Sequence, residues 1–383
     1  MATKLSRVIY GSQVLQSLPN VLADYGVKRH VFILTGRSLA FKTPVIESIQ
    51  AILNPIQTTV FPDISQHAPV EAIKRAAELM ARSQPEAVVA VGGGSPIDSG
   101  KLVLKEYFDA FGVWLPYIAI PTTLSAAECT TTAGMTSPEG HKTGAALKDS
   151  EWVPKVIIYD GETAMHTPKD LFVSSGMRAV DHAVELQYLE GAPEFQKQLA
   201  LTAVSDLVEI LPLIQREEGS ETDQRNLRVQ ALLAAFRSLF PVISLRSIGM
   251  SHSFGHALGA SYGIPHGITS CLTLPTVLRY KASKSAEEAK AIAKIARYLP
   301  GRVVTDSKSD VEVANAVADA VQALVEELGY AKTLDDYKVP RSRQEAESIV
   351  QRARLVDREK DPLKHEELVK LVYSLYRSES SAL

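Results

Sequence analysis

The feature that most restricts the fold is a change of periodicity near residue 167. Before it, short apolar runs rich in β-branched residues alternate with segments whose apolar residues recur at helical spacing. This alternation predicts βαβ units and a parallel sheet. We expect helices over residues 43–53 and 69–83. We expect buried strands in RHVFILTG (29–36), TTVFPD (58–63), EAVVAVGGG (86–94), YIAIPTT (117–123) and KVIIYD (155–160).

The second part of the chain has a different pattern. After HTPKD (166–170) the strand pattern ends, and amphipathic helical periodicity follows over residues 196–215, 225–239, 285–299 and 310–329. We therefore expect two domains. Residues 1–167 form an α/β domain with a parallel sheet, and residues 168–383 form an all-helical domain.

Composition narrows the class of protein. The net charge of −3 gives no basic excess for a nucleic acid or an anionic membrane. The two cysteines, Cys129 and Cys271, form no CxxC pattern, which favours a reducing compartment. The first residues lack the apolar run of a signal peptide, and no stretch has the ~18 apolar residues of a membrane span. We expect a cytoplasmic protein without nucleic-acid or membrane partners.

The stretch VVAVGGGSPIDSGK (88–101) predicts a ligand site. A buried strand runs into three glycines, after which a helix begins with Ser95 as the expected N-cap residue. Glycines let the backbone approach a phosphate closely, and free N–H groups at a helix start favour negative charge. The stretch matches neither GxGxxG nor the P-loop pattern. The alternative is a tight strand-to-helix turn without a ligand.

The stretch LTGRSLA (34–40) bears on the choice of nucleotide. In dinucleotide folds, a carboxylate near this place binds the ribose 2′-hydroxyl, whereas small residues with an arginine accept a 2′-phosphate. Here the tip contains Gly36 and Arg37 and no carboxylate. A nicotinamide cofactor would therefore be NADP or NAD, with NADP favoured. A solvated loop arginine is the alternative.

Two further stretches gather histidines. In SSGMRAVDHAVE (174–185), Arg178 and His182 stand one helical turn apart, but a guanidinium only donates hydrogen bonds and cannot bind a cation. In IGMSHSFGHALGASYGIPHG (248–267), His252 and His256 are again one turn apart, and His266 follows a proline. From the residues alone, a metal site, an anion site and ordinary packing all remain open.

Several motifs together identify a resemblance. In order and spacing, the chain resembles the iron-containing (group III) alcohol dehydrogenase superfamily, which includes glycerol dehydrogenases and maleylacetate reductases. The resemblance implies a Rossmann-like N-terminal domain, an all-helical C-terminal domain, an NAD(P)-dependent oxidoreductase and a homodimer. The motifs are GGGSPIDSGK, IPTTLSAAECT (120–130), HKTG (141–144), VIIYD (156–160), SGMRAVDHAVE (175–185) and SHSFGHALGASYGIPHGITSCLTLP (251–275).

The resemblance also implies a cofactor site. The residues matching the pyrophosphate region are Gly93, Gly94, Ser95 and Asp98. The residues matching the path of the adenosine, ribose and nicotinamide are Thr122, Thr123 and Lys142.

Metal-dependent members of the superfamily hold a divalent ion with one aspartate and three histidines. His182, His252 and His266 match the histidines, but Arg178 stands at the aspartate position. At ~4 Å, two like unit charges repel by about 4 kcal/mol at an effective dielectric constant of about 20, and a doubly charged ion doubles this. We therefore expect no bound metal. If one is bound, these three histidines hold it.

Maleylacetate reductases are similar to this chain in keeping the histidines, lacking the aspartate and working without metal. The segment QHAPVEAI (66–73) resembles theirs, although they usually carry a small polar residue where Arg178 stands. We expect hydride transfer to a carbonyl or enone of a carboxylated or otherwise anionic small molecule. The catalytic candidates are Arg178, His182, His252, His256 and His266.

Within this set, Arg178 would hold a carboxylate or oxyanion, and His252 or His256 would donate the proton. Pairing of Arg178 with Asp181 or Glu185 is the structural alternative. Two other functions remain open: a zinc- or iron-dependent alcohol dehydrogenase, and an NAD-using lyase or cyclase similar to dehydroquinate synthase.

Overall fold

The computed structural model describes residues 4–66, 68–137, 142–146, 151–240, 249–306, 308–355 and 361–377. The chain forms two compact units, one of residues 1–172 and 213–244 and the other of residues 173–212 and 245–383. The chain thus leaves the first unit after residue 172 and returns to it for residues 213–244. A single boundary at residue 167 remains a prediction.

The first unit contains a six-stranded parallel sheet in the order β1-β8-β5-β4-β2-β3. This confirms the expected α/β domain and all five expected strands. The sheet has one more strand, β1, which was not expected because its position at the edge leaves half-buried and exposed residues along it. The strands are β1 (Arg7–Gly11), β2 (His30–Leu34), β3 (Gln57–Phe61), β4 (Ala87–Gly92), β5 (Tyr117–Pro121) and β8 (Val156–Asp160).

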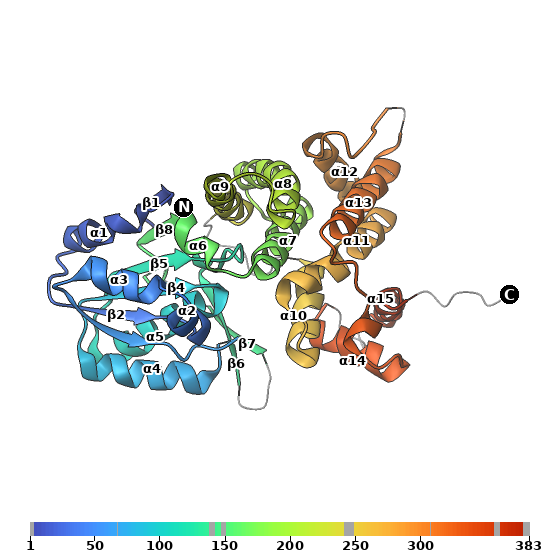
Figure 1. Ribbon diagram of the computed structural model, residues 1–383. Helices are drawn as coiled ribbons and strands as arrows, with labels where there is room; N and C mark the ends of the chain where they lie inside the picture. Colours follow the sequence, from blue (N-terminus) through green and yellow to red (C-terminus); the bar gives the residue numbers. More distant parts are fainter. Residues whose placement is uncertain are drawn as a thin grey trace. The chain divides into compact units, whose positions relative to one another are not determined.

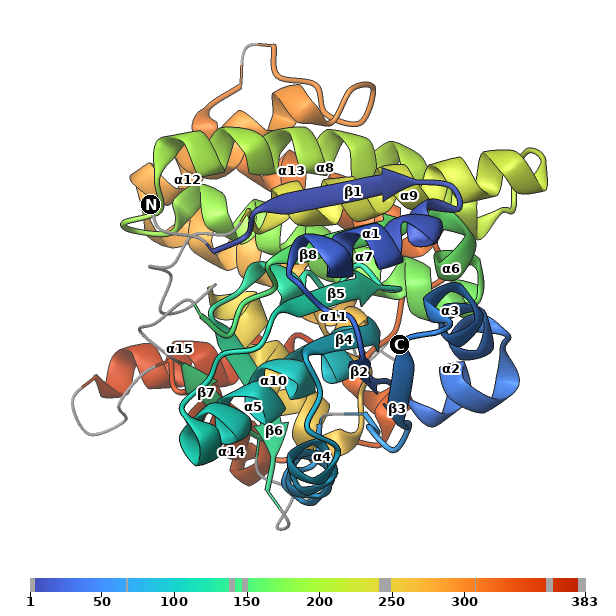
Figure 2. The same ribbon diagram turned by 90° about the vertical axis from the view of Figure 1, so that its left-hand side faces the viewer.

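Helices cover both faces of this sheet (Figures 1 and 2). On one face, α1 (Leu18–Asp24) and α3 (Val45–Leu53) bury apolar side chains against alternate strand residues such as Ile33, Val89 and Ile118. On the other face lie α4 (Val70–Ser83) and α5 (Gly94–Phe111), which pack against each other. Because β4 and β5 are buried on both faces, they read in the sequence as continuous apolar runs.

Three smaller elements complete the path through the first unit. The short helix α2 (Arg37–Lys42) follows β2, and α6 (Gly161–Met165) follows β8. An antiparallel hairpin of β6 (Thr132–Thr136) and β7 (Lys142–Ala146) follows β5.

A late segment of the chain also belongs to the first unit. Helix α9 (Glu221–Ser238) packs against α6, β8 and β1. The approach is close, because a Cβ atom on Gly161 would lie 2.7 Å from the carbonyl oxygen of Arg225. Arg225 also forms an ion pair with Glu162, and the guanidinium of Arg228 lies 4.6 Å from the centre of the Phe172 ring. The β-rich first unit is therefore completed by a helix from beyond residue 220.

Glu86 joins the segments that precede β2 and β4. Its carboxylate accepts the backbone N–H groups of Lys28 and Arg29 at 2.7 and 2.8 Å and pairs with the Arg29 side chain. These hydrogen bonds, that of Lys28 first, lower the pKa of Glu86 from 4.5 to about 2. The ionised carboxylate therefore stabilises the folded state above pH 4.5, and this stabilisation is lost as the pH falls towards 2.

We accordingly expect Glu86→Gln to lower the free energy of unfolding at pH 7 by about 1 kcal/mol, or about 2–4 °C in Tm. Thermal unfolding followed by circular dichroism at pH 7 and at about pH 3.5 measures the difference between variant and wild type. The difference should shrink at the lower pH. A difference that is the same at both pH values would contradict this role.

In the second unit, the described residues form helices and turns without a strand, as expected for an all-helical domain. Helix α11 packs against α10, α12 and α13, and α10 packs against α14. The helices are α7 (Lys169–Glu185), α8 (Glu194–Gln215), α10 (Met250–Tyr262), α11 (His266–Lys284), α12 (Ala286–Ala293), α13 (Asp310–Glu327), α14 (Arg343–Ala353) and α15 (Pro362–Tyr373). Within the described part of the chain, α8 alone is long and apolar enough to cross a membrane by length and composition, and 56% of that window is buried inside the protein.

Candidate active site

The glycine-rich turn lies at the carboxyl end of β4. The strand ends at Gly92, Gly93 is the N-cap residue, and α5 begins at Gly94. The expected N-cap at Ser95 is therefore wrong, because the helix starts two residues earlier and places Ser95 in its first turn. This 18-residue helix therefore begins at the carboxyl edge of the sheet, and an anion is favoured at such a helix start.

The neighbouring strand closes one side of this turn. Thr122 and Thr123 follow β5, and the backbone N–H of Thr122 donates to the carbonyl of Gly92 at 2.9 Å. A Cβ atom on Gly93 would lie 3.1 Å from the Thr123 side chain, and one on Gly94 would lie 3.1 Å from Oγ of Ser125. Glycine is needed at these positions because backbone and side chains approach so closely.

Asp98 is fixed by the protein itself. Its carboxylate accepts the backbone N–H of Gly134 at 3.0 Å and pairs with Lys101 Nζ at 3.2 Å. Sequence reasoning gave no role to Lys101, which is completely buried. The ammonium also donates to the carbonyl oxygens of Ala127 and Thr132 and to the hydroxyl of Thr130. Asp98 and Lys101 thus hold the segment after β5 against α5.

Two residues of the expected motifs lie partly or wholly outside the described part of the structure. Lys142 is the first residue of β7, but its side chain lies outside the described part of the structure. His67, in the QHAPVEAI segment, also lies outside the described residues.

At the end of β2, Gly36 is the N-cap residue of α2 and Arg37 is its first residue. The sequence showed no carboxylate at this tip. The structure brings one from the neighbouring strand, because Arg37 Nη1 pairs with Asp63 Oδ1. The same guanidinium lies 5.3 Å from the centre of the Phe41 ring.

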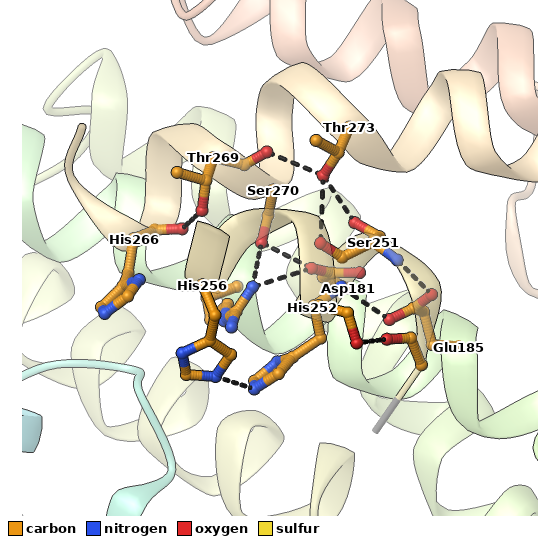
Figure 3. A network of polar contacts seen from close by, with 12 residues as sticks. Asp181, Glu185, Ser251, His252, His256, His266, Thr269, Ser270 and Thr273 are labelled. Atoms are coloured by element: carbon orange, nitrogen blue, oxygen red, sulfur yellow. Dashed lines mark hydrogen bonds and ion pairs between the residues drawn. The ribbon is translucent and has the colours of Figure 1, made fainter. Parts of the chain in front are cut away.

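In the second unit, helix α7 turns one polar face inward. Arg178, Asp181, His182 and Glu185 follow at intervals of three, one and three residues, which places them on one side of a helix. All four side chains are buried. Figure 3 shows Asp181 and Glu185 within a polar network that also includes residues of α10 and α11.

Arg178 is held at one nitrogen. Its Nη1 donates to Asp181 Oδ2 at 3.2 Å and to the Ser270 hydroxyl at 3.1 Å, and Ser270 donates to Asp181 at 2.6 Å. Among the described residues, Nε and Nη2 make no hydrogen bond. Gly255 makes room for the guanidinium, because a Cβ atom there would lie 3.0 Å from Nη1. Arg178 therefore does pair with Asp181, which was the structural alternative to a ligand-binding role, and this pair compensates the positive charge of the guanidinium.

Burial changes the pKa values of this pair. It lowers the pKa of Arg178, against the opposing negative charges of Asp181 and Glu185. It raises the pKa of Asp181, against the opposing charge of Arg178 and the hydrogen bond from Ser270. Arg178 and Asp181 thus each favour the charged form of the other, whereas burial disfavours both charges.

The four histidines form a row. The Nε2 atoms of His252 and His256 lie 2.8 Å apart, so that one donates and the other accepts (Figure 3). The ring centres are 5.4 Å apart for His182 and His252 and 5.6 Å apart for His256 and His266. Burial, and then the charge of Arg178, lowers the pKa of His182 well below its ordinary value, which keeps that imidazole neutral. All five catalytic candidates thus lie in one cluster.

The sequence suggests Glu185 only as a possible partner of Arg178, whereas the structure places its carboxylate at the start of α10. Its carboxylate accepts the backbone N–H groups of Ser251 and His252 at 2.8 and 3.0 Å and so caps the start of α10. Gly249, with φ +151°, leaves the space, because a Cβ atom there would lie 2.5 Å from this carboxylate. Burial, and then the charge of Asp181, raises the pKa of Glu185 to about 8.

Buried polar contacts thus join the three helices that carry the histidines. Asp181 and Ser270 join α7 to α11, and Glu185 joins α7 to α10. The hydroxyls of Ser251 and Thr273 join α10 to α11 at 2.8 Å. Among the residues that the structure describes, no three histidine, cysteine, aspartate or glutamate side chains are placed to hold one metal ion.

Comparisons with known proteins agree with this architecture. The family model for iron-containing alcohol dehydrogenase matches residues 6–161, and the model for the C-terminal part of the Fe-containing alcohol dehydrogenase family matches residues 172–376. A maleylacetate reductase of Rhizobium sp. (strain MTP-10005) is 29% identical over 305 residues, which cover 79% of this chain and 80% of the relative.

Solved structures have the same fold. The crystal structure of maleylacetate reductase from Agrobacterium tumefaciens has a TM-score of 0.78 at 22% identity and covers 98% of this chain and 97% of its own. That of 1,3-propanediol oxidoreductase has a TM-score of 0.83 at 22% identity, with coverage of 97% and 98%. The chain therefore belongs to the iron-containing alcohol dehydrogenase family and is an NAD(P)-dependent oxidoreductase.

Proposed function

We propose that this enzyme is a metal-independent NAD(P)H-dependent reductase that acts, as maleylacetate reductases do, on a carbonyl or enone of a carboxylated or otherwise anionic small molecule. One observation carries the proposal. Arg178 stands where metal-dependent members have an aspartate ligand, and it is buried and fixed among the candidate histidines.

Metal independence is supported by the set of donor atoms. A permanent cation replaces the anionic ligand, and Asp181, the nearest carboxylate in sequence, is engaged by Arg178 and Ser270. The Nε2 atoms of His252 and His256 face each other instead of a common point. These residues do not fit a divalent ion, and no step is assigned to one.

An anionic substrate is supported by the way in which Arg178 is held. Asp181 and Ser270 fix one nitrogen of the guanidinium, which leaves Nε and Nη2 as donors. Two parallel N–H groups match the oxygens of a carboxylate, and a fixed guanidinium loses little conformational entropy on binding. The negative charge of Asp181 reduces the positive potential at Arg178. Binding of an anionic substrate would therefore depend on the hydrogen-bonding geometry of Arg178 as much as on its charge.

The proton would come from the pair of His252 and His256. The reduced nicotinamide supplies the hydride when bound. His252 and His256 share one hydrogen between their Nε2 atoms, and this pair can hold one extra proton without losing that bond. It can therefore give the proton to the developing alkoxide or enolate. The ring of neutral His182 lies beside that of His252, with their centres 5.4 Å apart.

The cofactor is proposed to be NADP or NAD. Gly93, Gly94, Ser95, Thr122 and Thr123 would hold its pyrophosphate and ribose, and Arg37 would contact a 2′-phosphate. Asp98 would act by positioning the neighbouring segment. A homodimer is also proposed. A location in the cytoplasm is proposed as well, in keeping with the two buried free cysteines, Cys129 and Cys271.

The test combines metal analysis with turnover. For the purified enzyme we expect substoichiometric zinc and iron, and we expect oxidation of NADPH or NADH with maleylacetate to continue unchanged after dialysis against a chelator. A ketone of similar size without a carboxylate should react at least ~10²-fold more slowly in kcat/KM, because Arg178 then has no partner.

Each competing function gives a different result. One equivalent of zinc or iron that is lost together with activity would establish the metal-dependent dehydrogenase. Product formation without net consumption of NAD(P)H would establish the lyase or cyclase. Equal turnover of the neutral ketone would refute the anionic substrate.

A further inference from the structure

The tip of the first unit that would face the cofactor ribose contains an ion pair whose carboxylate comes from a different strand than expected. Arg37 follows β2, and Asp63 follows β3. Their side chains are paired although the residues are 26 positions apart in the chain. Sequence reasoning considered only the β2 tip and predicted an arginine without an acidic neighbour.

The sheet explains why this pair forms. Strands β2 and β3 are parallel neighbours with Leu34 opposite Phe61, so both chains leave the sheet at the same edge. Backbone hydrogen bonds extend this register, from Thr35 N to the carbonyl of Phe61 at 3.1 Å and from Ile64 N to the carbonyl of Thr35 at 3.2 Å. The positions of Arg37 and Asp63 are therefore set by a rigid part of the backbone.

Position 36 has little space for a side chain. A Cβ atom on Gly36 would lie 3.1 Å from the carbonyl oxygen of Ile64, so that even a small side chain needs some backbone adjustment. The only carboxylate in contact with Arg37, among the described residues, is that of Asp63. The guanidinium also lies 5.3 Å from the centre of the Phe41 ring.

We propose that Asp63 is the residue that selects between the two nicotinamide coenzymes. Its carboxylate pairs with Arg37 and so keeps that guanidinium from a 2′-phosphate, and it can accept a hydrogen bond from an unmodified ribose 2′-hydroxyl. This inference rests on the proposed function in that it requires an adenine nucleotide at this tip. In dinucleotide folds, the residue that distinguishes NAD from NADP ordinarily lies at the end of β2. Here the proposal assigns this role to a residue that follows β3.

The experiment measures binding only. The probes are adenosine 2′,5′-bisphosphate, which carries the 2′-phosphate, and adenosine 5′-diphosphate, which does not, each titrated calorimetrically into the full chain. The variants are Asp63→Asn, Arg37→Gln and the double variant. The control is Asp24→Asn, which removes a carboxylate from another exposed ion pair of the same unit, with Arg7 at the amino end of β1.

We expect Asp63→Asn to tighten binding of the 2′,5′-bisphosphate by about five- to tenfold, because Arg37 then loses its partner and can pair with the 2′-phosphate. The affinity for the 5′-diphosphate should change less than twofold, and the gain should shrink in ~0.5 M salt. Arg37→Gln should abolish the gain in the double variant. Asp24→Asn should leave both affinities unchanged.

An unchanged ratio of the two affinities in Asp63→Asn would overturn the proposal, and so would a gain that persists without Arg37. Should neither probe bind the wild-type chain, the proposed function itself would fail. Binding of the 5′-diphosphate with an unchanged ratio refutes the selecting role of Asp63 alone. Because Asp63 is partly exposed, its replacement by asparagine should not alter Tm.

Discussion

Replacing Arg178 by glutamine is expected to lower kcat/KM for maleylacetate by about 10²- to 10³-fold and the free energy of unfolding by about 3–5 kcal/mol. The kinetic loss follows from removing the donors that would hold the carboxylate or oxyanion. The loss of stability follows because Asp181 is completely buried and would remain without its counter-ion. Steady-state kinetics and urea unfolding followed by circular dichroism measure the two effects.

A double variant separates these roles. Arg178→Gln with Asp181→Asn removes both charges, so most of the stability should return while the activity should not. Recovery of activity together with stability would mean that Arg178 only supports the fold. Arg178→Lys adds a further control: it keeps the charge but cannot pair with two oxygens in parallel, and it should recover only part of kcat/KM.

Replacing Gly267 by alanine is expected to remove more than about 4 kcal/mol of stability, which should leave little soluble protein at 37 °C. Gly267 is the second residue of α11, and a Cβ atom there would lie 2.1 Å from the carbonyl oxygen of Ser174 in α7. The obstacle is backbone, so a side-chain rotation cannot relieve it. Helices α7 and α11 would have to separate, and they carry Arg178 and His266.

Gly329→Ala is the matched control in the same unit. Gly329 follows α13 with φ +78°, and a Cβ atom there would meet nothing within 4 Å. Alanine should therefore cost only about 1 kcal/mol of backbone strain. Soluble yield and Tm measure both variants. Equal losses would contradict the contact between α7 and α11 as the cause.

The fold was predictable where burial is complete. Strands β2, β4 and β5 are covered on both faces, so nearly every residue is apolar and the pattern is plain. Strand β1 was missed because Arg7 and Tyr10 are exposed at the edge of the sheet and interrupt the pattern. The sequence predicts the start of α5 two residues too late, because a serine side chain is a common N-cap and a glycine gives a weaker signal.

The candidate site was predictable only in part. Residues one helical turn apart, such as His252 and His256, could be placed together from spacing alone. The partners that decide their chemistry come from distant segments: Ser270 lies 89 residues after Asp181, and Ser251 lies 66 residues after Glu185. Such contacts depend on how helices pack, which a local pattern does not encode.

The placement of α9 has a consequence for biosynthesis. When residue 172 leaves the ribosome, the sheet is complete in sequence, but the helix that covers α6, the edge strand β1 and its neighbour β8 is not yet made. The intervening 72 residues, 173 to 244, take roughly 4–15 s to translate. During that interval the surface around Gly161, which α9 contacts through Arg225 and Val229 in the folded chain, stays uncovered, and uncovered surface of this kind favours aggregation.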